Sequence, residues 1–287
     1  MNRIGILGCG RIAPRHVDAI ERTEGLELVA VCDNVSARRD ELAGPLGIPA
    51  YAKLQQMLDG TDLDTVVLCT PSGFHAAQGI AAAKAGKNVI TEKPMATTVH
   101  DADALIRACD DADIHLFVVK QNRLNPPVQL LKRAVDKGRF GRIFMVNATV
   151  RWSRPQGYYD QAKWRGTWEF DGGCFMNQAS HYLDLLLWLM GPVEGVTAKT
   201  ATLARRIETE DTGAAILRFR DGALGVIEVT VLTYPRNLEG SVTIIGEKGT
   251  VKLGGVAVNK METWNFAEYD DDDREVEDSN YKPKDVY

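Results

Sequence analysis

The chain has 287 residues, of which 45% are hydrophobic, so it is long enough to build two cores. It contains no apolar run of about 18 residues that could span a membrane, and its N-terminus enters a strand-like run at residues 4–7 where a signal peptide would carry a basic segment. The net charge of −5 argues against a general polyanion binder, which needs Lys and Arg without offsetting acids. We therefore expect a cytoplasmic protein with a small-molecule substrate and with no nucleic-acid or membrane partner.

The first 120 residues alternate short apolar runs with segments of helical spacing. Such alternation predicts parallel strands joined by right-handed helical crossovers, which is a Rossmann arrangement. The expected strands are residues 4–7, 28–32, 65–69, 89–91 and 115–119. The expected helices are residues 11–23, 36–46, 53–58, 74–85 and 99–111.

The pattern changes near residue 120. A helix is predicted over residues 126–136, with Asn125 as its N-cap, and long alternating strands follow at residues 143–152 and 224–232. Turn signals at Asp221-Gly222 and at residues 246–249 predict antiparallel hairpins. The chain is therefore expected to be α/β, with a Rossmann domain at residues 1–121 and an α+β domain with an open, mainly antiparallel sheet at residues 122–287.

An apolar sheet face must be covered by helices, by another subunit or by both, so we also expect a homo-oligomer, either a dimer or a tetramer. The acidic stretch at residues 270–278 is interpreted as a solvated loop or tail. The sequence ends at Tyr287 without an apolar closing helix, which predicts a frayed terminus or a truncated sequence.

Cysteine usage indicates a reducing compartment. The five cysteines form an odd set with no C-x-x-C pair, and three lie in or beside strand-like runs, so we expect reduced thiols. They are Cys9, Cys32, Cys69, Cys109 and Cys174.

A dinucleotide fingerprint follows the first predicted strand. Residues 8–13 read G-C-G-R-I-A and open the first helix, so the glycines permit a tight turn and close approach of a pyrophosphate. Asp33 ends the second strand about twenty residues later, where a carboxylate can accept from both ribose hydroxyls and would repel a 2′-phosphate. The pattern favours NAD over NADP, although Arg38 or Arg39 could bend back to a phosphate.

Three further segments carry candidate chemistry. The run T-P-S at residues 70–72 lies at the carboxyl edge of the sheet, and His75 after it either touches the cofactor or caps a helix. The run E-K-P at residues 92–94 also lies at this edge, where burial would lower the pKa of Lys93 and suit it to deprotonate or polarise a hydroxyl. On one predicted helix, Asn177, His181 and Asp184 share a face, which favours a working site over a satisfied core histidine. A metal site is disfavoured because no further histidine or carboxylate lies at ligand spacing nearby.

These motifs together resemble the glucose–fructose oxidoreductase/inositol dehydrogenase family over essentially the whole chain. The resemblance implies that the E-K-P lysine and the helix histidine act around the reacting carbon. More narrowly, residues 120–127, 164–173 and 177–181 are similar to the UDP-N-acetylglucosaminuronate 3-dehydrogenases of bacterial O-antigen (lipopolysaccharide) synthesis, in which NAD oxidises the sugar 3-hydroxyl. Many relatives carry aspartate where this chain has Asn177, which argues for substrate binding there and against a carboxylate relay. Relatives also carry a closing C-terminal segment.

An acidic nucleotide sugar as substrate agrees with a group of basic residues in segments expected to border the cleft, although the chain as a whole is acidic. These residues are Arg123, Lys163, Arg165 and Arg236. Aromatic residues could stack on sugar or base, although core packing explains them as well. These are Tyr158, Trp164 and Trp168.

We assign catalysis to Lys93 and His181, without deciding which is the base, and expect no metal. We assign cofactor binding to Gly8, Gly10, Arg11, Ile12, Asp33, Asn34, Thr70, Pro71, Ser72, His75, Glu92, Lys93, Gln121, Trp164 and Arg165. We assign substrate binding to Lys93, Arg123, Asn125, Lys163, Arg165, Thr167, Asn177, Gln178, His181, Tyr234 and Arg236. The alternatives are a dehydrogenase of a free sugar or polyol and a non-catalytic NAD-binding regulator.

Overall fold

The computed structural model describes residues 1–279, so the expectation about the chain terminus lies outside the described residues. Contacts divide the chain into two units. The first is Met1–Val119 together with the short segment Glu169–Asp171, and the second holds the described residues of Lys120–Trp168 and from Gly172 onward. The sequence predicted a boundary two residues later and did not anticipate the short segment.

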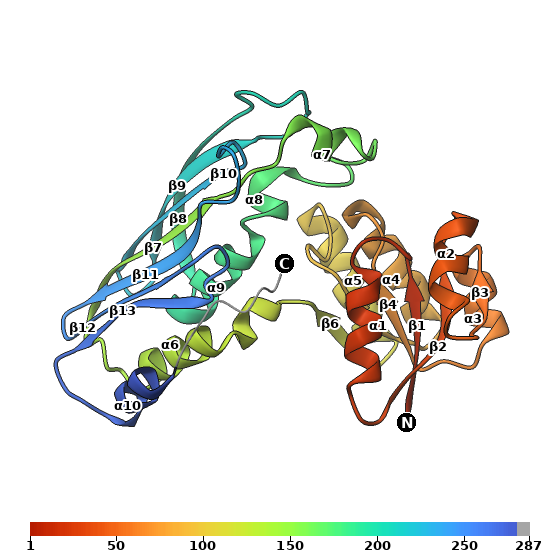
Figure 1. Cartoon of the computed structure of the whole chain (residues 1–287), viewed down its shortest axis with the longest axis horizontal. Helices are drawn as coiled ribbons and strands as arrows, with labels where there is room; N and C mark the ends of the chain where they lie inside the picture. Colours follow the sequence, from red (N-terminus) through yellow and green to blue (C-terminus); the bar gives the residue numbers. More distant parts are fainter. Residues whose placement is uncertain (280–287) are drawn as a thin grey trace. The chain divides into compact units, whose positions relative to one another are not determined.

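The first unit is a six-stranded parallel sheet with the strand order β3-β2-β1-β4-β5-β6 (Figure 1). Its strands are β1 (Asn2–Leu7), β2 (Leu26–Cys32), β3 (Ala50–Tyr51), β4 (Thr65–Leu68), β5 (Asn88–Thr91) and β6 (Leu116–Val118). Its helices are α1 (Ala13–Glu21), α2 (Ser36–Ala43), α3 (Leu54–Gly60), α4 (His75–Lys84) and α5 (Val99–Asp111), with a 3₁₀ turn, η1 (Ser72–Phe74), before α4. The predicted Rossmann arrangement is confirmed. The sequence missed β3 because two partly exposed residues make no apolar run.

Both faces of this sheet are covered, as parallel sheets require. Side chains alternate along β1, so Ile4 and Ile6 join a core with Val17 and Ile20 of α1, whereas Leu7 joins the core of the opposite face. All five cysteines are buried free thiols, which confirms the prediction.

The second unit contains a seven-stranded sheet with the order β13-β12-β11-β7-β10-β9-β8. Its strands are β7 (Ile143–Arg151), β8 (Val193–Ala201), β9 (Thr212–Phe219), β10 (Leu224–Thr230), β11 (Glu239–Gly246), β12 (Gly249–Gly254) and β13 (Lys260–Phe266). Only β7 and β10 pair in parallel among these neighbours, so the predicted mainly antiparallel sheet is confirmed, together with both predicted hairpins.

Helices cover one face of this sheet. They are α6 (Pro126–Asp136), α8 (Gly173–Asn177) and α9 (Ser180–Met190), and the same unit also holds η2 (Gln121–Leu124) and α7 (Gln156–Asp160). Leu131 of α6 and Leu185 of α9 pack into one core with Val146, Ala148 and Val150 of β7. The bounds of α6 match the prediction, but the side chain of the N-cap residue donates to the carbonyl of Ala257 at 3.1 Å and makes no cap bond.

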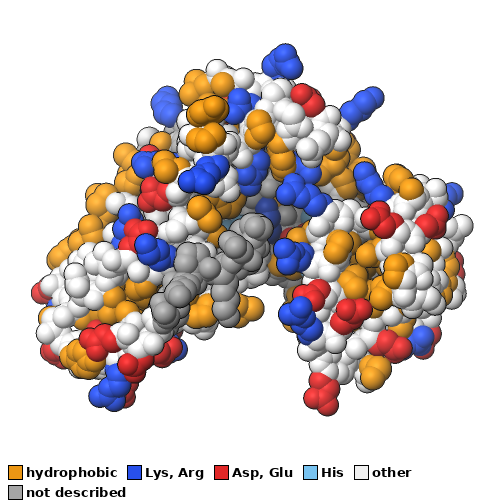
Figure 2. Space-filling view, viewed as in Figure 1, with side chains coloured by type: hydrophobic (Ala, Val, Ile, Leu, Met, Phe, Trp, Pro, Cys, Tyr) orange, Lys and Arg blue, Asp and Glu red, His pale blue; other side chains and the backbone are white. Residues whose placement is uncertain are grey.

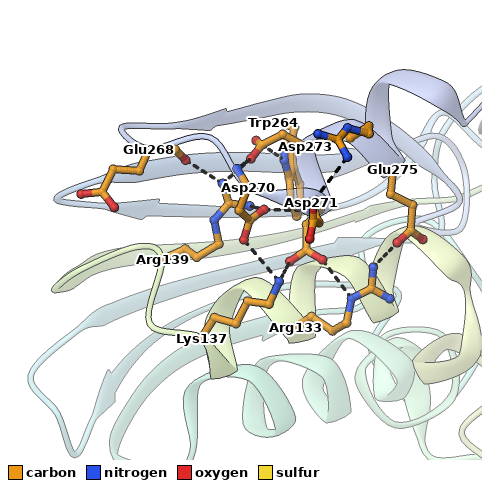
Figure 3. Close-up of polar contacts among 11 residues, drawn as sticks. Arg133, Lys137, Arg139, Trp264, Glu268, Asp270, Asp271, Asp273 and Glu275 are labelled. Carbon is orange, nitrogen blue, oxygen red and sulfur yellow. Dashed lines mark hydrogen bonds and ion pairs between the residues drawn. The ribbon is translucent and has the colours of Figure 1, made fainter.

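The acidic stretch is not a solvated tail. It forms α10 (Asp271–Asp278), and Asp270 caps this helix with a capping box (Figure 3). Asp272 is buried and accepts from Lys137 at 2.7 Å, while Asp273 accepts from Arg139 at 2.6 Å and from Trp264 Nε1 at 2.9 Å. The prediction was wrong because the cations that neutralise these carboxylates lie more than a hundred residues earlier in the chain.

Candidate active site

The glycine-rich loop fits a dinucleotide. Gly8 has φ +98°, and a Cβ there would lie 2.7 Å from the backbone carbon of Cys69, so only glycine fits. A Cβ on Gly10 would meet no atom within 4 Å. Open space over Gly10 is what close approach of a ligand to the backbone requires. The N-cap residue of α1, Ile12, makes no side-chain cap bond, and the positive N-terminal end of the helix favours an anion such as pyrophosphate.

Asp33 braces this loop. One oxygen of its carboxylate accepts from the N–H of Cys9 at 2.8 Å and the other from the N–H of Val35 at 2.8 Å. Each carboxylate oxygen has further lone pairs, so Asp33 can still accept from ribose hydroxyls. Arg39 donates to the backbone oxygen of Asp33 at 2.9 Å, which holds this guanidinium at the end of β2.

The loops after β4 and β5 are joined by polar contacts. Glu92 contacts His16 of α1 through Oε1 and Nε2 at 2.9 Å, so the E-K-P run is tied to the helix that follows the glycine loop. His75 contacts the carbonyl oxygens of Thr70 and Pro94, each at 2.8 Å. The sequence assigned His75 to direct cofactor contact or to capping, but it makes no cap bond and both ring nitrogens face protein carbonyls.

All the predicted cofactor residues of the first unit lie in the segments that follow β1, β2, β4 and β5. These segments meet at the carboxyl edge of a parallel sheet, where ligands bind in this architecture. His16 was missed by sequence reasoning. The sequence could have indicated His16 through its position, which is about one turn after the fingerprint on the helix that follows the glycine-rich loop.

In the second unit the predicted single helix is two helices. Asn177 ends α8 and His181 lies in the first turn of α9. The three residues Asn177, His181 and Asp184 therefore do not lie on one helix, and the expected shared face is not formed. The break arises where the N–H of Ala179 reaches back to the carbonyl of Cys174 at 2.9 Å, five residues earlier. His181 and Asp184 do share α9, and His181 is 4% exposed.

Asp184 is held by a bidentate ion pair. Arg123 donates from Nε and Nη2 to its two oxygens, both at 2.7 Å, and the guanidinium also lies 5.2 Å from the ring of Trp188. Asp184 therefore neutralises much of the positive charge of Arg123. Burial lowers the pKa of the nearby Lys120, while Asp184 opposes this shift and Arg123 adds to it.

A basic and aromatic cluster surrounds α7. The guanidinium of Arg165 lies 4.1 Å from the ring centre of Tyr158 and 4.9 Å from that of Trp164, and Arg154 lies 5.5 Å from Tyr158 on the same ring. Figure 2 shows Lys and Arg side chains on the surface around α7. Arg154 was missed by sequence reasoning, although it follows the strand of residues 143–152 in an aromatic and basic run.

The remaining predicted substrate residues lie in the same unit. Asn237 accepts from the N–H of Ser153 at 2.9 Å and from Arg154 at 3.2 Å, which ties the loop carrying Tyr234 and Arg236 to the segment after β7. Tyr234 is 95% exposed. Lys163 is exposed, Gln178 is buried, and Thr167 donates to the carbonyl of Trp164 at 2.7 Å.

The loop next to Arg154 depends on one buried carboxylate. Asp211 has no exposed surface and accepts from the N–H groups of Leu203, Ala204 and Arg205, each at 2.9 Å. Arg205 in turn donates to the carbonyl of Arg154 at 2.7 Å. Burial raises the pKa of Asp211, but the three N–H groups outweigh burial, so the pKa lies below its usual value.

Replacing Asp211 by asparagine, written Asp211→Asn, should lower the free energy of unfolding at pH 7 by about 2 kcal/mol, because the amide cannot accept all three bonds. A carboxyl with a lowered folded pKa stabilises the protein above its unfolded pKa of about 4 and loses that effect as the pH falls from there through the lower folded pKa. The difference in free energy of unfolding between the wild type and the variant should therefore become smaller as the pH is lowered. Urea unfolding followed by tryptophan fluorescence measures it, since all five tryptophans lie in the second unit.

Asp221→Asn is the matched control, because this carboxylate is exposed and accepts from one N–H, that of Ala223, at 3.0 Å. A difference in unfolding free energy for Asp211→Asn that stays constant as the pH falls from 7 to well below about 4 would contradict the assignment.

Two family models match the chain. The model described as "Oxidoreductase family, NAD-binding Rossmann fold" matches residues 2–119, and that of the GFO/IDH/MocA C-terminal domain matches residues 128–252. Together they cover most of the sequence. The chain belongs to the GFO/IDH/MocA oxidoreductase family. The predicted family, fold and cofactor are thereby confirmed, and the chain is an NAD-dependent dehydrogenase.

Solved members of this family are closely similar. The WlbA dehydrogenase from Bordetella pertussis, in complex with NADH and UDP-GlcNAcA, is 55% identical with a TM-score of 0.96, covering 98% of this chain and 81% of that chain. The WlbA dehydrogenase from Chromobacterium violaceum, with the same two ligands, is 56% identical with a TM-score of 0.94, covering 96% and 81%. The myo-inositol 2-dehydrogenase of Thermotoga maritima is 30% identical over 258 residues, which are 87% of this chain and 74% of that protein. Within residues 1–279, no helix is both long and apolar enough to cross a bilayer.

Proposed function

We propose that this NAD-dependent dehydrogenase oxidises the 3-hydroxyl of UDP-N-acetylglucosaminuronic acid (UDP-GlcNAcA) to the 3-keto sugar, in the cytoplasmic synthesis of lipopolysaccharide O-antigen. The main support is the likeness to two WlbA dehydrogenases, at 55% and 56% identity, whose structures hold NADH and UDP-GlcNAcA. The position of oxidation comes from the resemblance to the 3-dehydrogenases.

The basic and aromatic cluster around α7 supports an acidic nucleotide sugar. Arg154 and Arg165 flank the ring of Tyr158, so the second unit offers guanidinium groups that suit phosphate or carboxylate oxygens, beside rings on which a base can stack. A neutral polyol would need neither, so the cluster favours the nucleotide sugar.

In the proposed reaction, one of Lys93 and His181 accepts the proton of the 3-hydroxyl, and the other stabilises the oxygen as negative charge develops on it. The C3 hydrogen leaves with its electron pair as the carbonyl forms. NAD supplies the hydride acceptor. Asp33 and the open backbone at Gly10 hold the dinucleotide, and Asp184 orients Arg123 beside the helix that carries His181.

A polyol dehydrogenase is the second candidate, because myo-inositol 2-dehydrogenase is 30% identical over most of this chain. A non-catalytic regulator is disfavoured, because both Lys93 and His181 are present.

A substrate panel separates these functions. Purified protein with NAD should form reduced nicotinamide, followed by its absorbance, with UDP-GlcNAcA and not with UDP-GlcNAc, UDP or myo-inositol. UDP-GlcNAc has a hydroxymethyl group in place of the carboxylate, so it tests the need for a uronate. If the bound nucleotide is not released, the signal should stop near one equivalent per subunit. Formation of reduced nicotinamide with myo-inositol but not with UDP-GlcNAcA would reject the proposal.

We also propose a homo-oligomer. Apolar side chains lie on the sheet face opposite the helices, including Ile216 of β9 and Leu224 of β10, which are 56% and 50% exposed. The mass in solution measured by light scattering decides between a monomer, which contradicts this, and a dimer or tetramer.

A further inference from the structure

His75 connects two loops at the carboxyl edge of the first sheet. It is the first residue of α4 and is 1% exposed. Its Nδ1 lies 2.8 Å from the carbonyl oxygen of Pro94, and its Nε2 lies 2.8 Å from that of Thr70. Thr70 follows β4 and Pro94 follows β5, so one ring spans the ends of two neighbouring strands.

The Pro94 contact bears directly on Lys93. Before the lysine, the N–H of Glu92 donates to the carbonyl of Leu68 at 3.0 Å, which continues the pairing of β5 with β4. After the lysine, the ring of His75 contacts the next carbonyl, that of Pro94. The backbone of Lys93 is therefore held on both sides, and His75 supplies the hold on the side that the sheet does not reach.

The Thr70 contact bears on the loop T-P-S. This loop lies beside the glycine-rich loop, because the backbone of Cys69 meets the position of a Cβ on Gly8 at 2.7 Å. Thr70 also donates through Oγ1 to Gln78 of α4 at 2.6 Å. Both contacts of Thr70 lead to α4, so His75 helps to fix this loop next to the dinucleotide fingerprint.

A buried histidine with two partners can be a packing residue only. The alternative is that each ring edge has its own task. Burial lowers the pKa of His75, and the two carbonyls and the Glu92 carboxylate oppose that shift. Both facing atoms are carbonyl oxygens, which only accept, so a neutral ring with its single N–H donates to Pro94 in one tautomer and to Thr70 in the other, and substitution can separate the two edges.

We propose that His75 is a positioning residue with two separable tasks: its Nδ1 edge sets Lys93 for the reaction, and its Nε2 edge sets the Thr70 loop for NAD. The first task rests on the proposed role of Lys93. The second depends only on NAD binding.

Asparagine and glutamine test the two edges one at a time. The amide nitrogen of asparagine reaches about as far as Nδ1, and that of glutamine about as far as Nε2. His75→Asn should keep kcat within about threefold and weaken NAD binding about tenfold, the worth of about one hydrogen bond. His75→Gln should keep NAD affinity and lower kcat about 100-fold, because a small displacement of a reacting group is costly. His75→Ala should show both losses.

NAD affinity is measured by calorimetry without substrate, and kcat with whichever substrate of the panel is oxidised. His100→Gln is the control, since that side chain is 86% exposed on α5 of the same unit. Equal losses in all three His75 variants, or a wild-type-like His75→Ala, would overturn the proposal. Failure of the wild type on UDP-GlcNAcA would reject the proposed function alone, and the calorimetric comparison of the asparagine and glutamine variants would still decide the role of His75.

Discussion

Lys93→Met should abolish turnover of UDP-GlcNAcA, with a loss in kcat of about 1,000-fold or more, while NAD stays bound. Methionine has nearly the length of lysine but can neither take a proton nor stabilise an oxyanion, and general acid–base catalysis contributes about 100- to 10,000-fold. Steady-state kinetics measures kcat, and calorimetry measures the dissociation constant for NAD, which should change by less than about threefold.

Lys84→Met is the matched control, because this lysine is exposed at the end of α4 in the same unit. It should keep the wild-type kcat. Unchanged turnover in Lys93→Met would remove the lysine from the mechanism and leave His181 as the base.

Gly10→Ala should bind NAD about 100-fold more weakly, which corresponds to about 2.8 kcal/mol, without loss of thermal stability. A Cβ at Gly10 meets no protein atom within 4 Å, so the fold tolerates it, and the new methyl group occupies space that the pyrophosphate needs. Calorimetry gives the affinity, and a melting curve gives the stability.

Gly8→Ala provides the contrast two residues earlier. The backbone φ is +98° there, and the new Cβ would lie 2.7 Å from the backbone of Cys69, so the melting temperature should fall by several degrees, in line with strain of about 1–3 kcal/mol.

If Gly10→Ala bound NAD normally, the dinucleotide would not lie against this loop, and the cofactor site built on it would be wrong.

The first half of the site was largely predictable. The glycines of the fingerprint, Asp33 and the E-K-P run each follow a strand that local apolar patterning reveals, and parallel strands necessarily bring such loops to one edge. What the pattern could not give was how the loops hold one another. His16 on Glu92 and His75 on Pro94 join residues 76 and 19 positions apart, and no local spacing encodes those pairs.

The second half was less predictable. Helical spacing put Asn177 and His181 on one helix, but a backbone bond spanning five residues breaks it into α8 and α9. A basic residue near a cleft favours a ligand contact, yet Arg123 is committed to Asp184, 61 residues away. Charge composition alone cannot distinguish a cation that awaits a ligand from one that a distant carboxylate has already neutralised.

By itself the sequence determined the alternation of the main strands and helices in the first unit, the Rossmann class and the cofactor, because hydrophobic periodicity and glycine conformation act over a few residues. Only the tertiary structure decided that an acidic stretch becomes the helix α10, that two loops are tied by His75, and that Asp184 is paired. Each of these depends on the partner that folding brings to a charged or polar group, and the cost of burying such a group falls only when that partner is present.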